Sequence, residues 1–153
     1  MGEDDDFLRL DLQVCFPLYA ASNLFSRLYR PVLAKLGLTY PQYLVMLVLW
    51  EQAPQSVGAL GERLHLDSGT LTPLLKRMEG AGLVTRQRDA ADERRVLIAL
   101  TEQGMALRQQ ARDVPQTLAS GLSLSPDELI ELRASVQHLV AVLASAEATV
   151  SPS

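Results

Sequence analysis

The sequence predicts a mainly α-helical protein with one small β-hairpin, and three observations support this fold class. Apolar residues recur three and four positions apart through most of the 153-residue chain, which is the spacing of one helix face. After Gly82 the spacing changes, and two short runs rich in Val, Ile, Leu and Thr, LVTRQR and RVLIAL, flank the polar DAADER. Ser, Thr and Asp residues stand where helix caps are needed. Because 48% of the residues are hydrophobic, the chain is able to bury a core.

Two long helices are expected in the first third of the chain. Over residues 11–36 the apolar side chains form one stripe, with Pro17 tolerable in the first turn and Pro31 expected to bend the helix. Thr39 is the cap of the next helix, TYPQYLVMLVLWEQ, which is apolar on all sides. We therefore expect the second helix to lie at the centre of the fold.

Two short helices follow, and the hairpin comes directly after them. Ser56 opens the helix VGALGERL, and Asp67 or Ser68 opens GTLTPLLKRMEGA, which Gly82 ends. Two helices joined by a tight turn and followed by a β-hairpin form the element order of a winged helix-turn-helix.

The second helix of this pair has an apolar face and a polar face. Four apolar residues fall at positions i, i+3, i+4 and i+7 and should face the core, namely Leu71, Leu74, Leu75 and Met78. The outward residues are small and polar at the start of the helix and basic further along: Ser68, Gly69, Thr70, Thr72, Pro73, Lys76 and Arg77. Such a face suits a helix whose first turn enters a major groove while its cations meet phosphates, although an ordinary solvated face has the same pattern.

Arginine is concentrated around the hairpin of an otherwise acidic protein. The formal net charge is −4, yet residues 63–95 hold seven Lys or Arg against five Asp or Glu. Four arginines lie on or beside the hairpin connection: Arg86, Arg88, Arg94 and Arg95. Arginine at a protruding tip can enter a narrow minor groove, and Asp92 is placed to orient the Arg94 guanidinium by pairing with it. The helix pair and the hairpin together favour DNA binding.

Two more helices are expected after the hairpin. Thr101 caps a helix over about residues 102–120, which Pro115 bends or shortens, and SPDE at residues 125–128 joins a capping box to Pro at the first helical position. The last helix reaches about Ala148 and has one apolar stripe. The stripes of the first helix and of these last two lie outside the DNA-binding segment, and a second copy of the chain is the simplest partner for them.

Several classes of protein are disfavoured by composition. No run of about eighteen apolar residues occurs and the start, GEDDD, is acidic, so we expect a cytoplasmic protein without a membrane span or export signal; the GEDDD start and the VSPS end should lack regular structure. The two histidines, His65 and His138, stand far apart and without clustered ligands, so we expect no metal and no cofactor. The core should include Met46, Trp50 and Met78.

Specific motifs resemble a known family. DSGTLTPLLKRMEGAGLVTR followed by DERRVLIALTEQG is similar to the MarR family of dimeric winged-helix repressors, and with LQVCFPLYAAS, LYRPVL and LTYPQYLVMLVLWE the chain resembles its OhrR branch, over about residues 8–143. The resemblance implies one domain over residues 1–153, with a winged helix-turn-helix at about 39–100 and dimerisation helices at about 11–36 and 102–148. It also implies a homodimer on double-stranded operator DNA, contacted by Asp67, Ser68, Thr70, Thr72, Lys76, Arg77, Arg86, Asp92, Arg94 and Arg95.

The resemblance assigns a redox role to the only cysteine, Cys15. It implies that Tyr29 and Tyr40 reach this sulfur across the dimer interface, with Tyr19 nearby, and that an organic hydroperoxide oxidises it to sulfenic acid and so releases the operator. Only a thiolate attacks a peroxide, and an ordinary thiol with a pKa of about 8.5 is mostly protonated at neutral pH. Hydrogen-bond donors or a helix amino terminus would stabilise the anion, and Cys15 lies within a turn of the helix start expected at Asp11 or Leu12.

The chain departs from part of that branch at two positions. Some OhrR proteins carry a second, resolving cysteine near the end of the fifth helix, where this chain has Ser120. An oxidised Cys15 would therefore form a mixed disulfide with a low-molecular-weight thiol, or oxidise further. Arg95 stands where a small polar residue is expected.

Two alternative functions are compatible with the same residues. The protein could be a MarR-type repressor released by a small aromatic ligand, with Cys15 redox-inactive. It could instead be a thiol peroxidase that uses Cys15 as its nucleophile, but the basic helix and hairpin would then have no role, so we expect no enzyme.

Overall fold

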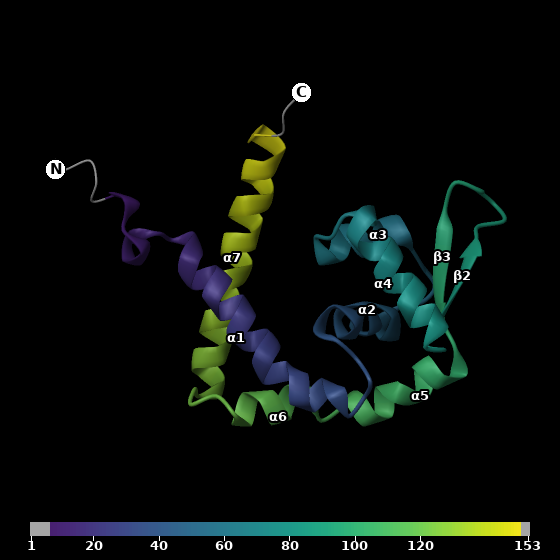
Figure 1. The fold of residues 1–153 in the computed structure, drawn as a ribbon, viewed down its shortest axis with the longest axis horizontal. Helices are drawn as coiled ribbons and strands as arrows, with labels where there is room; N and C mark the ends of the chain where they lie inside the picture. The colour runs from purple at the N-terminus through teal and green to yellow at the C-terminus, as the bar shows by residue number, and fades with distance from the viewer. Residues whose placement is uncertain (1–6, 151–153) are drawn as a thin grey trace. The chain divides into compact units, whose positions relative to one another are not determined.

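The fold class predicted from the sequence is confirmed by a computed structural model, which describes residues 7–150 (Figure 1). The chain divides into two compact units, one up to Pro115 and one from Gln116 onward. A short 3-10 helix, Leu10–Leu12, precedes the regular elements: α1 (Cys15–Ala34), α2 (Tyr40–Glu51), β1 (Gln55–Ser56), α3 (Val57–Leu64), α4 (Ser68–Gly80), β2 (Val84–Arg88), β3 (Val96–Leu100), α5 (Glu102–Ala111), α6 (Val114–Ser120) and α7 (Pro126–Val150). The GEDDD start and Ser151–Ser153 lie outside the described residues, whereas Val150 ends α7.

Helix α2 is the central helix of the first unit, as its all-round apolar sequence predicts. A capping box begins it, because the Gln42 backbone N–H donates to Thr39 Oγ1 at 3.4 Å and the Thr39 N–H donates to Gln42 Oε1 at 3.0 Å. The helix contacts α1, α3, α4 and α5. Its buried side chains are Tyr43, Val45, Met46, Val48 and Leu49. Trp50 is only partly buried, and its indole N–H donates to the Gly104 carbonyl at 2.9 Å.

The predicted helix pair is α3 and α4. Ser56 caps α3 through the Ala59 N–H, and Asp67 caps α4 through the Thr70 N–H. The turn between the two helices needs a close backbone approach at Gly61, where an added Cβ would lie 2.6 Å from the Leu66 carbonyl oxygen. The apolar face predicted for α4 is confirmed, since all four of its side chains are at most 5% exposed: Leu71, Leu74, Leu75 and Met78.

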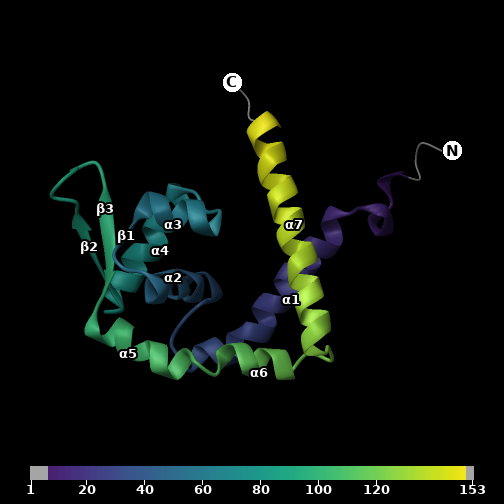
Figure 2. The ribbon, with the colours of Figure 1, turned by 180° about the vertical axis from the view of Figure 1, so that it is seen from behind.

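The predicted hairpin is confirmed, and it belongs to a three-stranded antiparallel sheet of order β1–β3–β2 (Figure 2). Strand β2 pairs with β3 in the register Val84 opposite Leu100, and Gln55 of β1 lies opposite Ile98. The sequence analysis missed β1, because two polar residues have no alternating pattern to detect. Ile98 is completely buried and anchors the sheet in the core.

Two helix predictions need correction. The first helix begins at Cys15 instead of Asp11, because residues 10–12 form a separate 3-10 turn. The helix expected over residues 102–120 is two helices, α5 and α6, with Pro115 in the first turn of α6, where a residue without an N–H is tolerated. Thr101 caps α5 as predicted, through the Gly104 N–H.

Helix α7 begins at the predicted capping box. The Ser125 N–H donates to Glu128 Oε2 at 2.7 Å, and the Glu128 N–H donates to Ser125 Oγ at 3.2 Å. By length and composition alone, residues 126–147 are able to cross a membrane, with a mean hydropathy of 1.3, and none of this window is buried. Its largest exposed apolar side chains include Ile130, Leu132, Val136, Val140, Val142 and Leu143.

Candidate functional site

The outward face of α4 is exposed as predicted. Thr72 is half-buried, and the other six residues of that face are exposed: Ser68, Gly69, Thr70, Pro73, Lys76 and Arg77. Asp67 has a local role at the start of this helix, because its carboxylate accepts the Thr70 N–H at 2.7 Å. This hydrogen bond lowers the pKa of Asp67 below its ordinary value.

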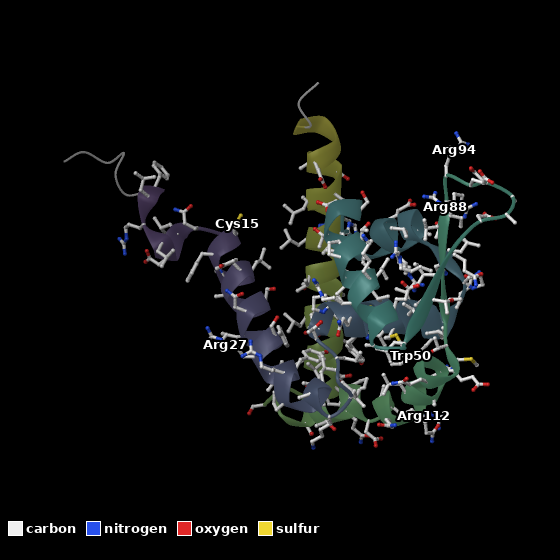
Figure 3. All side chains as sticks on the ribbon, turned by 45° about the vertical axis from the view of Figure 1, so that its right-hand side comes forward. Cys15, Arg27, Trp50, Arg88, Arg94 and Arg112 are labelled. Atoms are coloured by element: carbon white, nitrogen blue, oxygen red, sulfur yellow. The ribbon has the colours of Figure 1, made fainter. Side chains whose placement is uncertain are left out.

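At the hairpin tip, the predicted pairing of Asp92 with Arg94 is confirmed. Arg94 Nε donates to Asp92 Oδ1 at 3.1 Å and Nη2 donates to Oδ2 at 3.3 Å, so the contact is bidentate. These bonds lower the pKa of Asp92. The Arg94 side chain is nevertheless 91% exposed and extends from the hairpin connection (Figure 3). The guanidinium is thus held in orientation while remaining accessible to a large ligand.

Backbone hydrogen bonds fix the shape of the hairpin connection. The Asp89 N–H donates to the Arg95 carbonyl at 2.9 Å, and the Arg95 N–H donates to the Asp92 carbonyl at 3.0 Å. Arg88 Nη1 closes the loop from the other strand by donating to the Glu93 carbonyl at 2.8 Å. Arg95 lies 3.8 Å from the Asp89 carboxylate, and its side chain is 54% exposed. These hydrogen bonds therefore hold the loop in one conformation.

A groove of about 630 Å³ lies between α4 and the hairpin. It is lined by five of the residues predicted to contact DNA: Ser68, Thr72, Arg86, Arg94 and Arg95. Arg86 is the least accessible of these arginines, with 24% of its side chain exposed. Glu79 on α4 accepts its backbone N–H at 3.1 Å and lies 3.8 Å from its guanidinium. The other five predicted contacts do not line the groove: Asp67, Thr70, Lys76, Arg77 and Asp92.

Cys15 is exposed and is the first residue of α1 (Figure 3). No side chain caps this helix end, where Val14 occupies the N-cap position. The amide N–H groups of the first turn have no partner within a helix, and they make this end favourable for an anion. Tyr19 is one turn further along the same face, and its side chain is 68% exposed.

Tyr29 and Tyr40 lie together, but the fold does not bring them to Cys15 of the same chain. Their ring centroids are 4.7 Å apart. Tyr29 and Cys15 both belong to α1, and fourteen residues of helix separate them by about 21 Å. Any meeting of this sulfur with these phenols thus requires a second copy of the chain.

The sequence analysis missed Tyr43, which completes the tyrosine cluster. Its ring centroid is 5.9 Å from that of Tyr29 and 6.4 Å from that of Tyr40, and the residue is only 3% exposed. The i, i+3 spacing of the two tyrosines in TYPQY was the available signal. Burial raises the pKa of Tyr29 to about 12, with the nearby phenols of Tyr40 and Tyr43 adding to the rise. Burial also raises the pKa values of Tyr40 and Tyr43.

A metal centre finds no support in the part of the chain that the structure describes. Within residues 7–150, no three His, Cys, Asp or Glu side chains gather closely enough to hold a metal ion.

The helix pair, the sheet and the exposed basic groove define this chain as a winged-helix DNA-binding regulator. Residues 27–110 match the family model described as transcriptional regulator SarA/Rot. Over 90% of its length the chain is 48% identical to the organic hydroperoxide resistance transcriptional regulator of Bacillus subtilis (strain 168), of which it covers 94%. The chain belongs to the MarR family of transcriptional regulators, in its OhrR branch.

Solved structures agree with this membership. The crystal structure of AbfR of Staphylococcus epidermidis matches with a TM-score of 0.73 and 37% identity, over 94% of this chain and 97% of that chain. A structure of reduced AbfR bound to DNA matches with a TM-score of 0.78 and 38% identity, over 94% of this chain and 98% of that chain. In the second of these structures AbfR is bound to DNA in its reduced state.

Proposed function

We propose that this protein is a cytoplasmic, homodimeric repressor that binds operator DNA while Cys15 is reduced and releases it when an organic hydroperoxide oxidises that sulfur. The single observation that carries the proposal is the placement of Cys15. The sulfur is exposed at the start of α1, and Tyr29, the member of the tyrosine cluster that α1 carries, lies about 21 Å further along the same helix. A dimer in which α1 of each copy meets the other copy would place each sulfur beside its partner's phenols.

The DNA-binding half of the proposal rests on the groove between α4 and the hairpin. The first turn of α4 offers small polar side chains for base edges in a major groove, and Lys76 and Arg77 are exposed for phosphates. Arg94, oriented by Asp92, is suited to the adjacent minor groove. A dimer would present two such surfaces to half-sites about one helical turn of DNA apart.

The sensing step is a two-electron oxidation. The thiolate sulfur attacks the terminal oxygen of the hydroperoxide, an S–O bond forms and the O–O bond breaks, and the departing alkoxide takes a proton to become an alcohol. Cys15 becomes a sulfenic acid as the peroxide is reduced. The chain has no second cysteine, so a low-molecular-weight thiol then displaces the hydroxyl as water and forms a mixed disulfide.

The test compares wild-type protein with Cys15→Ser on a duplex selected from random sequences by the reduced protein. We expect both to bind with equal affinity in fluorescence anisotropy, and only wild type to dissociate after treatment with cumene hydroperoxide. When dimedone is present during the peroxide treatment, mass spectrometry of the wild-type protein should show a dimedone adduct at Cys15, which is the product of a sulfenic acid. Release of Cys15→Ser by the peroxide would overturn the sensor assignment.

The same variant separates redox sensing from control by an aromatic ligand. A repressor gated by such a ligand would respond identically with and without the thiol, and alkylation of Cys15 would leave its operator binding unchanged. If a thiol donor instead allowed each protein chain to reduce many molecules of peroxide, the result would support a peroxidase.

A further inference from the structure

The three tyrosines of the cluster, Tyr29, Tyr40 and Tyr43, form a closed triangle of aromatic contacts. Each ring contacts both others, with centroid separations of 4.7, 5.9 and 6.4 Å and interplanar angles of 48°, 42° and 42°. Tilted rings at these separations attract one another through their quadrupoles, which prefer such arrangements to a face-to-face stack. The orientation of each ring therefore depends on the other two.

Burial distinguishes Tyr43 from its two neighbours. Tyr43 is 3% exposed, whereas Tyr29 and Tyr40 are both partly exposed. Tyr43 lies one turn after Tyr40 on α2, a helix with five buried residues, while Tyr29 belongs to α1. The buried Tyr43 ring on α2 thus packs against Tyr29 of α1 as well as against Tyr40 of its own helix.

We propose that Tyr43 is a positioning residue of the redox sensor, whose buried ring holds the Tyr29 and Tyr40 rings in the arrangement that meets Cys15 of a second copy. This inference rests on the proposed function, in which those two phenols lie beside the sulfur of the other copy. Tyr43 acts through them and does not itself touch the sulfur or the peroxide.

The electrostatics of the triangle are consistent with that role. Burial and the neighbouring phenols raise the pKa of Tyr29 to about 12, and burial raises the pKa of Tyr40. Both side chains therefore stay protonated at physiological pH, and a protonated phenol is a hydrogen-bond donor for an anionic sulfur. A fixed ring keeps that donor aimed at one point, whereas a ring with freedom to rotate would spend less time there.

The experiment measures the second-order rate of Cys15 oxidation by cumene hydroperoxide in the full-length reduced protein, from loss of free thiol. Tyr43→Leu removes the ring, and we expect its rate to fall at least about tenfold, with the affinity of the reduced protein for its duplex within about twofold of wild type. Tyr43→Phe keeps the ring, and we expect a rate close to that of wild type.

A matched control separates positioning from loss of stability. Leu49→Ala removes a 1%-exposed side chain from the same helix and leaves all three tyrosines in the sequence, and we expect it to lower the melting temperature but leave the oxidation rate within about twofold. If Tyr43→Leu does not fold, Tyr43→Met replaces it, since a flexible chain fills most of the volume without a ring.

The outcomes distinguish this inference from the function on which it rests. A wild-type rate in a folded Tyr43→Leu or Tyr43→Met protein overturns the positioning role alone. An equal loss in Leu49→Ala also overturns it, because any destabilisation of α2 would then have the same effect. A wild-type Cys15 that does not react with the peroxide overturns both proposals.

Discussion

At the scale of single residues, Arg94 has an unusual combination of order and exposure. A side chain that is 91% exposed ordinarily has many rotamers, but the two hydrogen bonds to Asp92 restrict this one. In the free protein an exposed pair of this kind adds little to stability. The pair favours binding instead, because the guanidinium is already ordered in the free protein and loses less conformational entropy when DNA binds.

We expect Arg94→Ala to weaken binding of the reduced protein to its duplex about tenfold and to lower the salt dependence of binding by about one phosphate contact. Asp92→Asn keeps the cation but weakens its orientation, so it should lower affinity less and leave the salt slope unchanged. Anisotropy titrations over a range of KCl concentrations measure both quantities. An unchanged slope in Arg94→Ala would remove the hairpin tip from the DNA contacts.

At the scale of elements, α4 depends on a charged cap. The Asp67 carboxylate accepts the Thr70 N–H, and this bond lowers the pKa of Asp67 below its ordinary value of 3.8. A group whose pKa is lower in the folded state contributes stability above its unfolded pKa, and the contribution is lost as the pH falls through the folded value. Helix α4 should therefore lose stability in acid.

We expect Asp67→Asn, which keeps a capping oxygen but does not titrate, to melt a few degrees below wild type at neutral pH. The difference should shrink as the pH falls below about 4, because the wild-type cap becomes protonated there. Asp67→Ala, which has no cap at any pH, should melt below Asp67→Asn throughout. Thermal melts by circular dichroism at a series of pH values give the comparison, and a constant gap between wild type and Asp67→Asn would contradict the charged cap.

The same elements show what sequence patterns reveal and what they leave out. The caps at Thr39, Ser56, Thr101 and Ser125 were predictable because capping is local chemistry, and the buried face of α4 was predictable from its spacing. The start of α1 was not, because a 3-10 turn and the first turn of an α-helix use similar residues. Tyr43 was missed because a tyrosine in an apolar run has the pattern of a core residue, and only the fold brings it beside Tyr29.

At the scale of the whole molecule, exposed apolar surface calls for a partner. Helix α1 buries only Leu33, and no described side chain of α7 is buried. Apolar surface of this extent is uncommon on a monomer in water. The hydropathy of α7 would also suit a bilayer, but the proposed function requires a second copy of the chain, which is able to cover the same apolar side chains.

We expect Val140→Glu to break that association, because it places a charge in the apolar stripe of α7 beside Val136 and Leu143. Light scattering after size exclusion, without detergent, should give twice the 16.8-kDa chain mass for wild type and the chain mass for the variant. Ser145→Glu adds the same charge to the exposed face of the helix opposite this stripe and should stay dimeric. A dimeric Val140→Glu protein would remove α7 from the interface.

The length of α1 between Cys15 and Tyr29 has a genetic consequence. If each sensor takes its sulfur from one copy and its phenols from the other, a chain lacking the cysteine and a chain lacking the tyrosines each form dimers that do not respond to peroxide. Mixed in one cell, they would pair to give one intact sensor and one broken one. The mixed dimer would thereby regain one sensor, although dimers of identical chains would still hold the operator, and purified mixed dimers would reveal whether one oxidation is enough to release it.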